Sequence, residues 1–213
     1  MSGSRRLAQI LIGGHGEPEP LSVGRRNLSA MSNLTGRNQT ALLVVDVQND
    51  VVGNAWQRDE VVDRIAGLVD SARAADVPVV WVQHNDEEMT VGSAGWGIVD
   101  KLVRADGESR IDKQYGDSFA DTELEKVFEQ LDVGHFVLCG AQTDACITAT
   151  MYGGILRGYD VTLVEDAHTT DDSTFGGVQL PAELMVKHLV RAATYSGWPG
   201  VQLTATPADA ISW

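Results

Sequence analysis

The 213-residue sequence predicts an α/β protein, a three-layer α/β/α sandwich built on a mainly parallel, Rossmann-like sheet of about six strands. Two observations support this fold class. Short apolar segments typical of buried strands alternate along the chain with segments whose apolar residues recur at helical spacing. Several apolar segments also lack the polar alternation of a half-exposed strand, as expected for parallel strands covered on both faces.

The first half of the chain supplies three of the expected strands and one helix. Residues 41–47 form a continuous apolar strand with Asp46 near its end, and residues 48–50 break that pattern. A helix is expected over residues 60–75 and a second strand over 77–82. A long polar and glycine-rich connection follows over residues 84–97, and a short strand is expected at 110–113.

The second half continues the alternation, so that consecutive strands are expected to be parallel with right-handed crossovers. The pattern predicts a helix at 121–131, a strand at 135–139 and a helix from about residue 145 to a stop signal at Gly158. A strand at 159–164, a helix at 181–194 and a strand at 201–204 complete the domain, residues 39–213. Residues 1–38 show no sustained periodicity and are expected to form a disordered or loosely packed extension.

Composition excludes several classes of function. The formal net charge of −14 argues against nucleic acid or an anionic membrane surface as a partner, since both require basic patches. No apolar run is long enough to span a membrane. The two cysteines, Cys139 and Cys146, fall at the end of a strand and the start of the next helix. A structural disulfide is therefore not expected, and a reducing compartment such as the cytoplasm fits best.

Three reactive residue types fall at strand ends on one edge of the predicted sheet: Asp46, Lys113 and Cys146. Alone, each has an ordinary explanation as a turn residue, a solvated cation or a core thiol. Together they fall where open α/β sheets bind ligands. Cys146 is expected in the first turn of a helix, where unpaired amides and the helix dipole would lower the pKa of a nucleophilic thiol.

The sequence resembles the isochorismatase-like cysteine hydrolases, a family that includes nicotinamidase, N-carbamoylsarcosine amidohydrolase and ureidoacrylate amidohydrolase. The resemblance extends over about residues 40–205 and follows the order of the family's motifs. The matching segments are residues 42–50, 95–96, Lys113 with 118–124, 140–150 and 158–167. This set of Asp, Lys and Gly-x-x-Thr-x-x-Cys motifs is specific for the family and poorly specific for the substrate.

The resemblance implies a role for each residue of the set. Cys146 would be the nucleophile, Asp46 the general base, and Lys113 the countercharge that lowers the pKa of both. A non-proline cis peptide bond is expected between residues 141 and 142, with the backbone amides of Gln142 and Cys146 forming an oxyanion hole. By analogy with relatives, the protein is expected to be a homo-oligomer, a dimer or tetramer.

The sequence also departs from parts of the family. The Asp-x-His metal motif of nicotinamidases is absent, because residues 84–88 read His-Asn-Asp-Glu-Glu. We therefore expect neither a metal nor another cofactor. The family often has Phe where this chain has Val51, so the pocket floor is expected to differ. Candidate substrate-pocket residues are Gln48, Trp56, His84, Trp96 and Thr143. For the two tryptophans, hydrophobic packing is an equally good interpretation.

These features favour a metal-independent, cysteine-dependent hydrolase of a small non-peptide amide, carbamoyl or ureido compound, acting through a thioester. Two alternatives stay open. One is isochorismatase-type vinyl-ether hydrolysis, which uses the carboxylate as an acid and does not need the thiol. The other is a non-catalytic protein of the same fold in which Cys146 senses oxidation.

Overall fold

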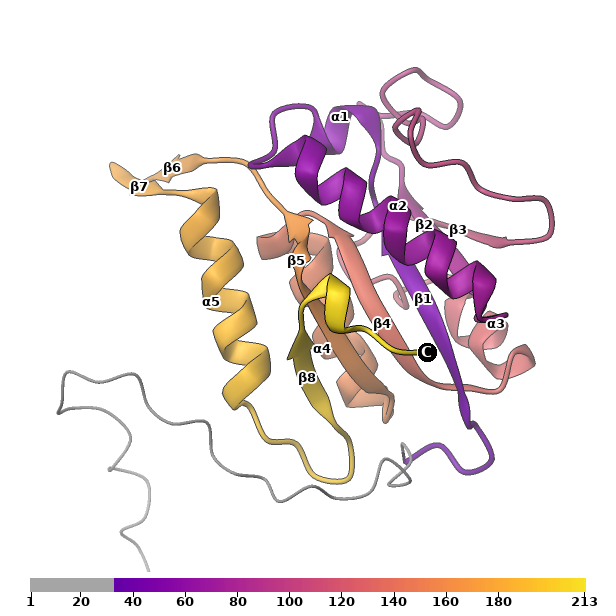
Figure 1. Ribbon diagram of the computed structural model, residues 1–213. Helices are drawn as coiled ribbons and strands as arrows, with labels where there is room; N and C mark the ends of the chain where they lie inside the picture. The colour runs from indigo at the N-terminus through magenta and orange to yellow at the C-terminus, as the bar shows by residue number, and fades with distance from the viewer. Residues whose placement is uncertain (1–32) are drawn as a thin grey trace, which may run out of the picture.

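The computed structural model describes residues 33–213 as a six-stranded sheet covered by helices on both faces (Figure 1). The strand order is β3-β2-β1-β4-β5-β8, and every neighbouring pair is parallel. The predicted three-layer α/β class is confirmed. The strands are β1 (Gln39–Val45), β2 (Val79–His84), β3 (Ser109–Lys113), β4 (Val133–Ala141), β5 (Asp160–Thr169) and β8 (Leu203–Thr206).

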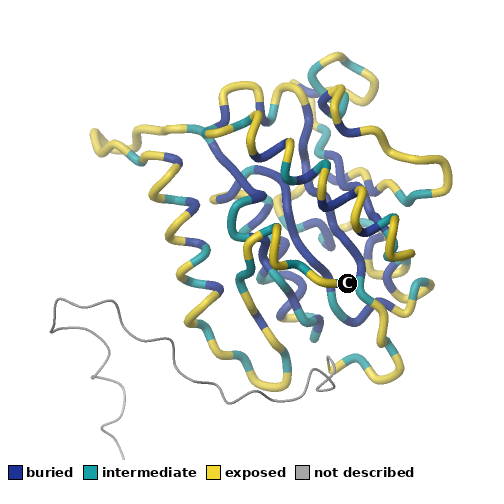
Figure 2. Tube along the Cα trace, in the orientation of Figure 1, coloured by how far each residue is buried: buried dark blue, intermediate teal, exposed yellow. Residues whose placement is uncertain are grey.

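The sheet separates two layers of the hydrophobic core, and each layer is covered by helices. Helix α2 (Arg58–Ala74) packs on one face of the sheet, where the C-terminal segment ending at Trp213 joins it. Helices α3 (Leu124–Gln130), α4 (Thr148–Arg157) and α5 (Ala182–Tyr195) cover the other face. The strands are buried along most of their length, and the helices expose their outer sides (Figure 2).

Strand β1 shows why the sequence produces these layers. Residues 41–45 are apolar and at most 1% exposed, so the strand is covered on both faces. Because successive side chains point to opposite faces, Leu43 and Val45 join the core under α3 and α4, whereas Leu42 and Val44 face α2. The core under α3 and α4 contains a packed aromatic group of Phe119, Phe128, Phe136 and Tyr159.

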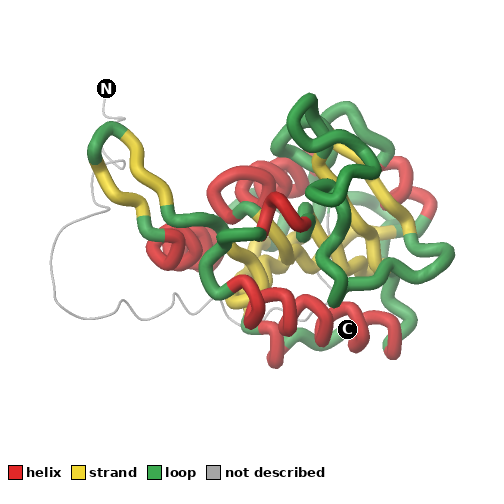
Figure 3. Tube along the Cα trace, turned by 90° about the horizontal axis from the view of Figure 1, so that it is seen from above, coloured by secondary structure: helices red, strands yellow, loops and turns green. Residues whose placement is uncertain are grey.

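Five details differ from the sequence-based expectation. A short helix, α1 (Asn49–Val52), follows β1, and β5 runs to Thr169 instead of ending at Val164. A π-helical segment, η1 (Thr143–Ile147), precedes α4. Strands β6 (Ser173–Phe175) and β7 (Val178–Leu180) form a hairpin that projects from the body (Figure 3). The last turn, η2 (Ala208–Ala210), is a 3-10 helix.

The predicted N-terminal extension lies mostly outside the described residues, since these begin at residue 33. Its last part, residues 33–38, contacts the domain. Arg37 donates a hydrogen bond to the Tyr159 hydroxyl (2.8 Å), and Leu34 packs against the core. Among residues 33–213, no helix is both long enough and apolar enough to cross a membrane.

Candidate active site

Asp46, Lys113 and Cys146 converge at the carboxyl edge of the sheet. The Lys113 ammonium lies 2.6 Å from Asp46 Oδ2 and 3.1 Å from Cys146 Sγ, and it also donates to the Tyr115 carbonyl (3.1 Å). Asp46 follows β1, Lys113 ends β3 and Cys146 lies in η1 after β4. The structure therefore brings together the three residues that the sequence placed at one edge.

Local backbone geometry explains how two of these side chains turn inward. Asp46 adopts a left-handed conformation (φ +51°), which Asp tolerates better than most residues and which ends β1 in a turn. On β3 the alternation of the strand buries Ile111 and Lys113 and exposes Asp112. Asp46 and Lys113 are each 1% exposed, so their ion pair is shielded from water.

Burial and mutual attraction set the charges of this pair. Burial raises the pKa of Asp46, and the neighbouring Lys113 ammonium counteracts only part of that rise. Burial by itself would lower the pKa of Lys113, but the charges of Asp46 and Cys146 outweigh it and raise the pKa above its ordinary value. Lys113 therefore stays protonated at neutral pH, and its ammonium is the group that most favours the ionised form of Asp46.

The expectation that the Cys146 thiol has a lowered pKa is wrong. Burial first, and the Asp46 carboxylate next, raise the pKa of this thiol to about 11, and the Lys113 ammonium only partly opposes them. The resting side chain is therefore a neutral thiol at pH 7. Such a thiol needs a base beside it to become a nucleophile, and Asp46 is the adjacent carboxylate.

The segment that carries Cys146 fits tightly against β1. Gly140 has φ +125°, and a Cβ atom there would lie 1.9 Å from the Val45 carbonyl oxygen, so only glycine fits. The peptide bond between Ala141 and Gln142 is cis, at the position expected from the resemblance. The amides of Ala145 and Ile147 both donate to the Gln142 carbonyl (3.1 Å each), which closes the turn around Cys146.

The end of β5 supports this turn from the other side. Buried Thr143 hydrogen bonds through Oγ1 to His168 Nδ1 (2.9 Å), and Gln142 Nε2 donates to Asp171 Oδ2 (3.2 Å). Burial lowers the pKa of His168 to about 4, so this imidazole is neutral at pH 7. Sequence reasoning missed His168 because it ended this strand at Val164. Thr143, predicted to line the pocket, is instead 1% exposed and engaged with His168.

Gln48 is a structural residue and not a pocket residue. Its side chain is fully buried, and its amide donates to the His84 and Trp96 carbonyls (2.9 Å each) while accepting from the His84 amide (2.7 Å). It thereby attaches the glycine-rich connection to the end of β2. The Trp96 ring lies under the Arg110 guanidinium, 5.1 Å from ring centroid to Cζ.

His84 is the pocket candidate that lies nearest the triad. Its Nδ1 is 3.5 Å from Lys113 Nζ, and its Nε2 is 3.2 Å from Asp86 Oδ2. Because the ammonium can only donate, Nδ1 faces it as an acceptor, and Nε2 carries the proton toward Asp86. The His84 side chain is 22% exposed, so it lies at the rim of the triad.

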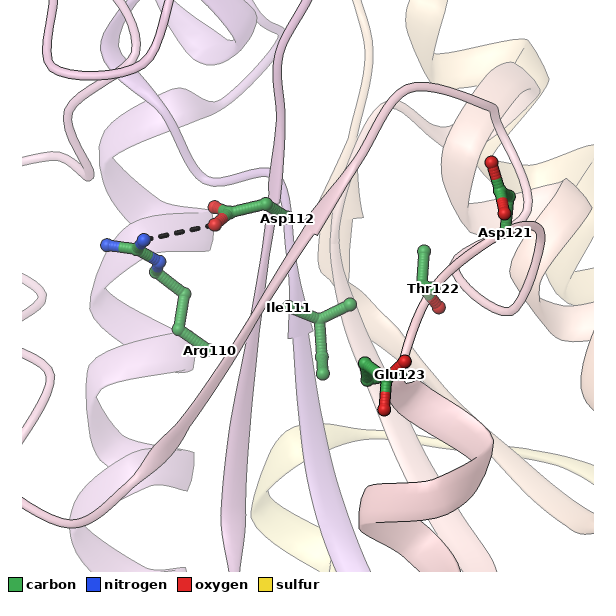
Figure 4. A pocket seen from close by; sticks show the side chains of 6 residues that line it. All are labelled: Arg110, Ile111, Asp112, Asp121, Thr122 and Glu123. Atoms are coloured by element: carbon green, nitrogen blue, oxygen red, sulfur yellow. Dashed lines mark hydrogen bonds and ion pairs between the residues drawn. The ribbon is translucent and has the colours of Figure 1, made fainter.

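Two cavities have linings that do not include Asp46, Lys113 or Cys146. One, of about 330 Å³, is lined by Asn54, Trp56, Asp171 and Asp172; it contains no triad residue, so the role of Trp56 as a wall of the substrate pocket stays a prediction. The other, of about 440 Å³, lies between β3 and the start of α3 (Figure 4). Arg110 and Asp112 pair there (3.0 Å), at a distance from Asp121 and Glu123 across the opening.

Within residues 33–213, no group of three or more His, Cys, Asp or Glu side chains is arranged to hold a metal ion. Both cysteines are free thiols; Cys139 is buried within β4, where burial raises its pKa, and Cys146 is partly exposed.

Known proteins share both the sequence pattern and the fold. A protein-family model described as the isochorismatase domain matches residues 40–179. A streptothricin hydrolase of Streptomyces noursei is 34% identical over 180 residues, which cover 79% of this chain and 71% of that protein. A cysteine hydrolase from Pseudomonas syringae pv. phaseolicola superposes with a TM-score of 0.73 at 20% identity, covering 84% of this chain and 93% of the other. N-carbamoylsarcosine amidase from Thermoplasma acidophilum superposes with a TM-score of 0.64 at 20% identity, covering 83% of this chain and 100% of the other.

The two structural matches establish the fold, and the match to the family model covers well over half of the chain. The structural matches and the family-model match agree with the motifs from which the family was predicted. This chain is a hydrolase that belongs to the isochorismatase family.

Proposed function

We propose that the protein is a cysteine-dependent hydrolase of a small non-peptide amide, carbamoyl or ureido compound. The observation that carries the proposal is the position of Lys113 Nζ, 2.6 Å from Asp46 Oδ2 and 3.1 Å from Cys146 Sγ. One buried cation thus bridges a carboxylate and a thiol. That arrangement suits transfer of the thiol proton to the carboxylate, because the ammonium stabilises negative charge on either partner.

In the proposed reaction, Asp46 accepts the Cys146 proton as Sγ attacks the substrate carbonyl carbon. The carbonyl π electrons move onto oxygen, and the backbone N–H groups of Gln142 and Cys146 are the proposed donors to that oxyanion. Protonated Asp46 then gives its proton to the leaving nitrogen, the C–N bond breaks, and an amine or ammonia departs. A thioester between Cys146 and the acyl group remains.

Water completes the cycle. Asp46 removes one proton from a water molecule whose oxygen attacks the thioester carbonyl. The tetrahedral intermediate collapses with cleavage of the C–S bond, and the sulfur regains its proton from Asp46. The acid product leaves, and the enzyme returns to a neutral thiol beside an ionised carboxylate. The raised pKa of the resting thiol supports this order of events, because the base must act at the moment of attack.

Vinyl-ether hydrolysis is the second candidate, favoured by the isochorismatase description of the matching family model. It would use protonated Asp46 as an acid, and Cys146 would be dispensable. A redox-sensing role is less well supported, since a sensor needs thiolate character and the pKa of this thiol is about 11.

A screen of small amides and ureides with ammonia detection, run on the wild type and on Cys146→Ala, tests the proposal. We expect turnover of at least one amide by the wild type and none by the variant. Vinyl-ether hydrolysis retained in Cys146→Ala would favour the second candidate. Reversible sulfenic acid at Cys146 without turnover of any amide would favour the sensor.

A further inference from the structure

His168 is a buried histidine near the end of β5 that the proposed reaction does not use. It is 1% exposed, and its Nδ1 lies 2.9 Å from the Oγ1 atom of Thr143, which is equally buried. Its other ring nitrogen, Nε2, has no hydrogen-bond partner among residues 33–213. A buried polar atom without a partner costs free energy that an apolar side chain would avoid. Stability alone therefore does not explain a histidine here, and the contact with Thr143 is what the ring provides.

The bond between His168 and Thr143 is the best shielded of the side-chain contacts that hold the turn around Cys146. Among the described residues, three hydrogen bonds between side chains join the end of β5 to residues 142–147. They pair Gln142 with Asp171, Thr143 with His168 and Asp144 with Thr170. Only Thr143 and His168 are both buried, because each of the other pairs has an exposed or partly exposed member. A hydrogen bond is stronger where the local dielectric is low, so this pair is the firmest of the three.

Thr143 occupies a position from which it can act on the reaction. It lies between Gln142 and Cys146, whose backbone amides are the proposed donors to the substrate oxyanion. Its own carbonyl accepts from Thr148 Oγ1 (2.6 Å), at the start of α4. Strand β5, which carries His168, pairs with β4 as far as the turn (Figure 1). The sheet and α4 therefore both hold Thr143. A reacting group displaced by about 1 Å can cost about 100-fold in rate, so such support matters.

We infer that His168 is a positioning residue of the reaction. Through the Thr143 hydroxyl it fixes the turn so that the amides of Gln142 and Cys146 meet the oxyanion, an inference that rests on the proposed function. The ring transfers no proton in this role. The oxyanion is absent from the bound substrate and develops only as Sγ attacks. Loss of the contact should therefore lower kcat and leave KM nearly unchanged.

Backbone NMR tests the contact without any substrate. The ¹H–¹⁵N signals of Gln142 and Cys146 are compared between the wild type and two variants, His168→Leu and Thr143→Val, which remove the same hydrogen bond from its two sides. We expect both variants to shift these signals, and the double variant to shift them no further than a single one. Thr143→Val, which keeps the shape of the side chain, decides the case if His168→Leu does not fold. Unchanged signals in the folded variants would overturn the inference.

His135 provides the matched control. Burial lowers its pKa to about 4, as it does for His168, and its ring also bonds to threonine hydroxyls, those of Thr40 (3.1 Å) and Thr162 (2.9 Å). It lies at the amino end of β4, however, whereas the turn follows the carboxyl end. His135→Leu therefore removes the same kind of contact away from the triad. It should leave the NMR signals of residues 142 and 146, and kcat, unchanged.

Kinetics then test the link to the reaction, with an amide substrate that the screen identifies. His168→Leu and Thr143→Val should each lower kcat by about tenfold or more, with KM within about twofold of the wild-type value. His168→Asn keeps a polar atom on Cγ that can bond to the Thr143 hydroxyl, so it should recover most of the loss.

Two kinetic results would overturn the inference. One is an equal kcat in the wild type and His168→Leu. The other is a loss in His135→Leu as large as that in His168→Leu, because both losses would then reflect general destabilisation. If the NMR signals shift as expected but the wild type hydrolyses no amide, the support of the turn by His168 stands and the proposed function fails.

Discussion

Replacing Lys113 with Met removes the buried cation and leaves the Asp46 carboxylate without its partner. The two groups lie 2.6 Å apart and are almost completely shielded from water. Removing one member of a buried ion pair costs about 3–5 kcal/mol, because an uncompensated charge remains inside the protein. We therefore expect the free energy of unfolding of Lys113→Met at pH 7 to fall by about that amount. Urea denaturation followed by circular dichroism measures it.

The pH dependence of this loss has a definite sign. Burial already raises the pKa of Asp46, and Lys113 is the main group that lowers it. In Lys113→Met the pKa of the folded state rises further above the unfolded value, so the folded state binds the extra proton. Stability relative to the wild type is therefore recovered as the pH falls through the folded pKa and lost as the pH rises through it. The deficit should be smaller at pH 5 than at pH 7.

The matched control is the double variant Asp46→Asn, Lys113→Met, in which neither charge is present. It should be more stable than Lys113→Met at pH 7, and its deficit should not depend on pH between 5 and 7. If the single and double variants are equally stable at pH 7, or if the deficit of Lys113→Met is the same at both pH values, Asp46 is not a buried carboxylate stabilised by Lys113.

Three further predictions follow from the same contacts. Because the pKa of Cys146 is about 11, its alkylation by iodoacetamide should be slow at pH 8 and should accelerate toward pH 11, with no labelling in Cys146→Ala. Lys113→Met should slow alkylation at pH 8, because it removes the ammonium that lowers the thiol pKa; unchanged or faster alkylation would contradict the proposed arrangement of charges. Gln48→Ala should lower the free energy of unfolding by about 1–3 kcal/mol, since it leaves the His84 backbone N–H and C=O unpaired; a loss below about 0.5 kcal/mol in urea denaturation would show that water replaces these bonds.

The sheet could be predicted because its strands are nearly continuous apolar runs. Residues 41–45 and 79–82 are buried on both faces, and that pattern is readable without coordinates. Asp46 and Lys113 could be placed at one edge because parallel strands share a carboxyl edge. The strand–helix pattern placed Cys146 at the same edge, and the family resemblance implied its role and the position of the cis peptide bond. The six strands and the four long helices were predicted with shifted ends, whereas α1, η1, η2 and the β6–β7 hairpin were not predicted.

The remaining features depend on tertiary contacts that leave no local pattern. Strands β6 and β7 have no buried residues, so no apolar periodicity in the sequence marks them as strands. His168 and Asp171 act on the Cys146 segment only because β5 lies beside β4. The predicted direction of the thiol pKa shift was wrong. The helix position favours a thiolate, but burial and the Asp46 carboxylate disfavour the thiolate more strongly. The pKa thus depends on the assembled site.

The central claim is that Cys146 is acylated and that Asp46 passes the thiol proton to the leaving nitrogen. The most direct measurement is mass detection of the thioester in a single turnover of an amide substrate found by the screen. The wild type should accumulate an acyl adduct on Cys146, and Cys146→Ala should form none. Asp46→Asn should form none, because no carboxylate accepts the thiol proton and the leaving nitrogen receives none. Thioester formation from the amide by Asp46→Asn at the wild-type rate, or full activity of Cys146→Ala, would contradict the mechanism.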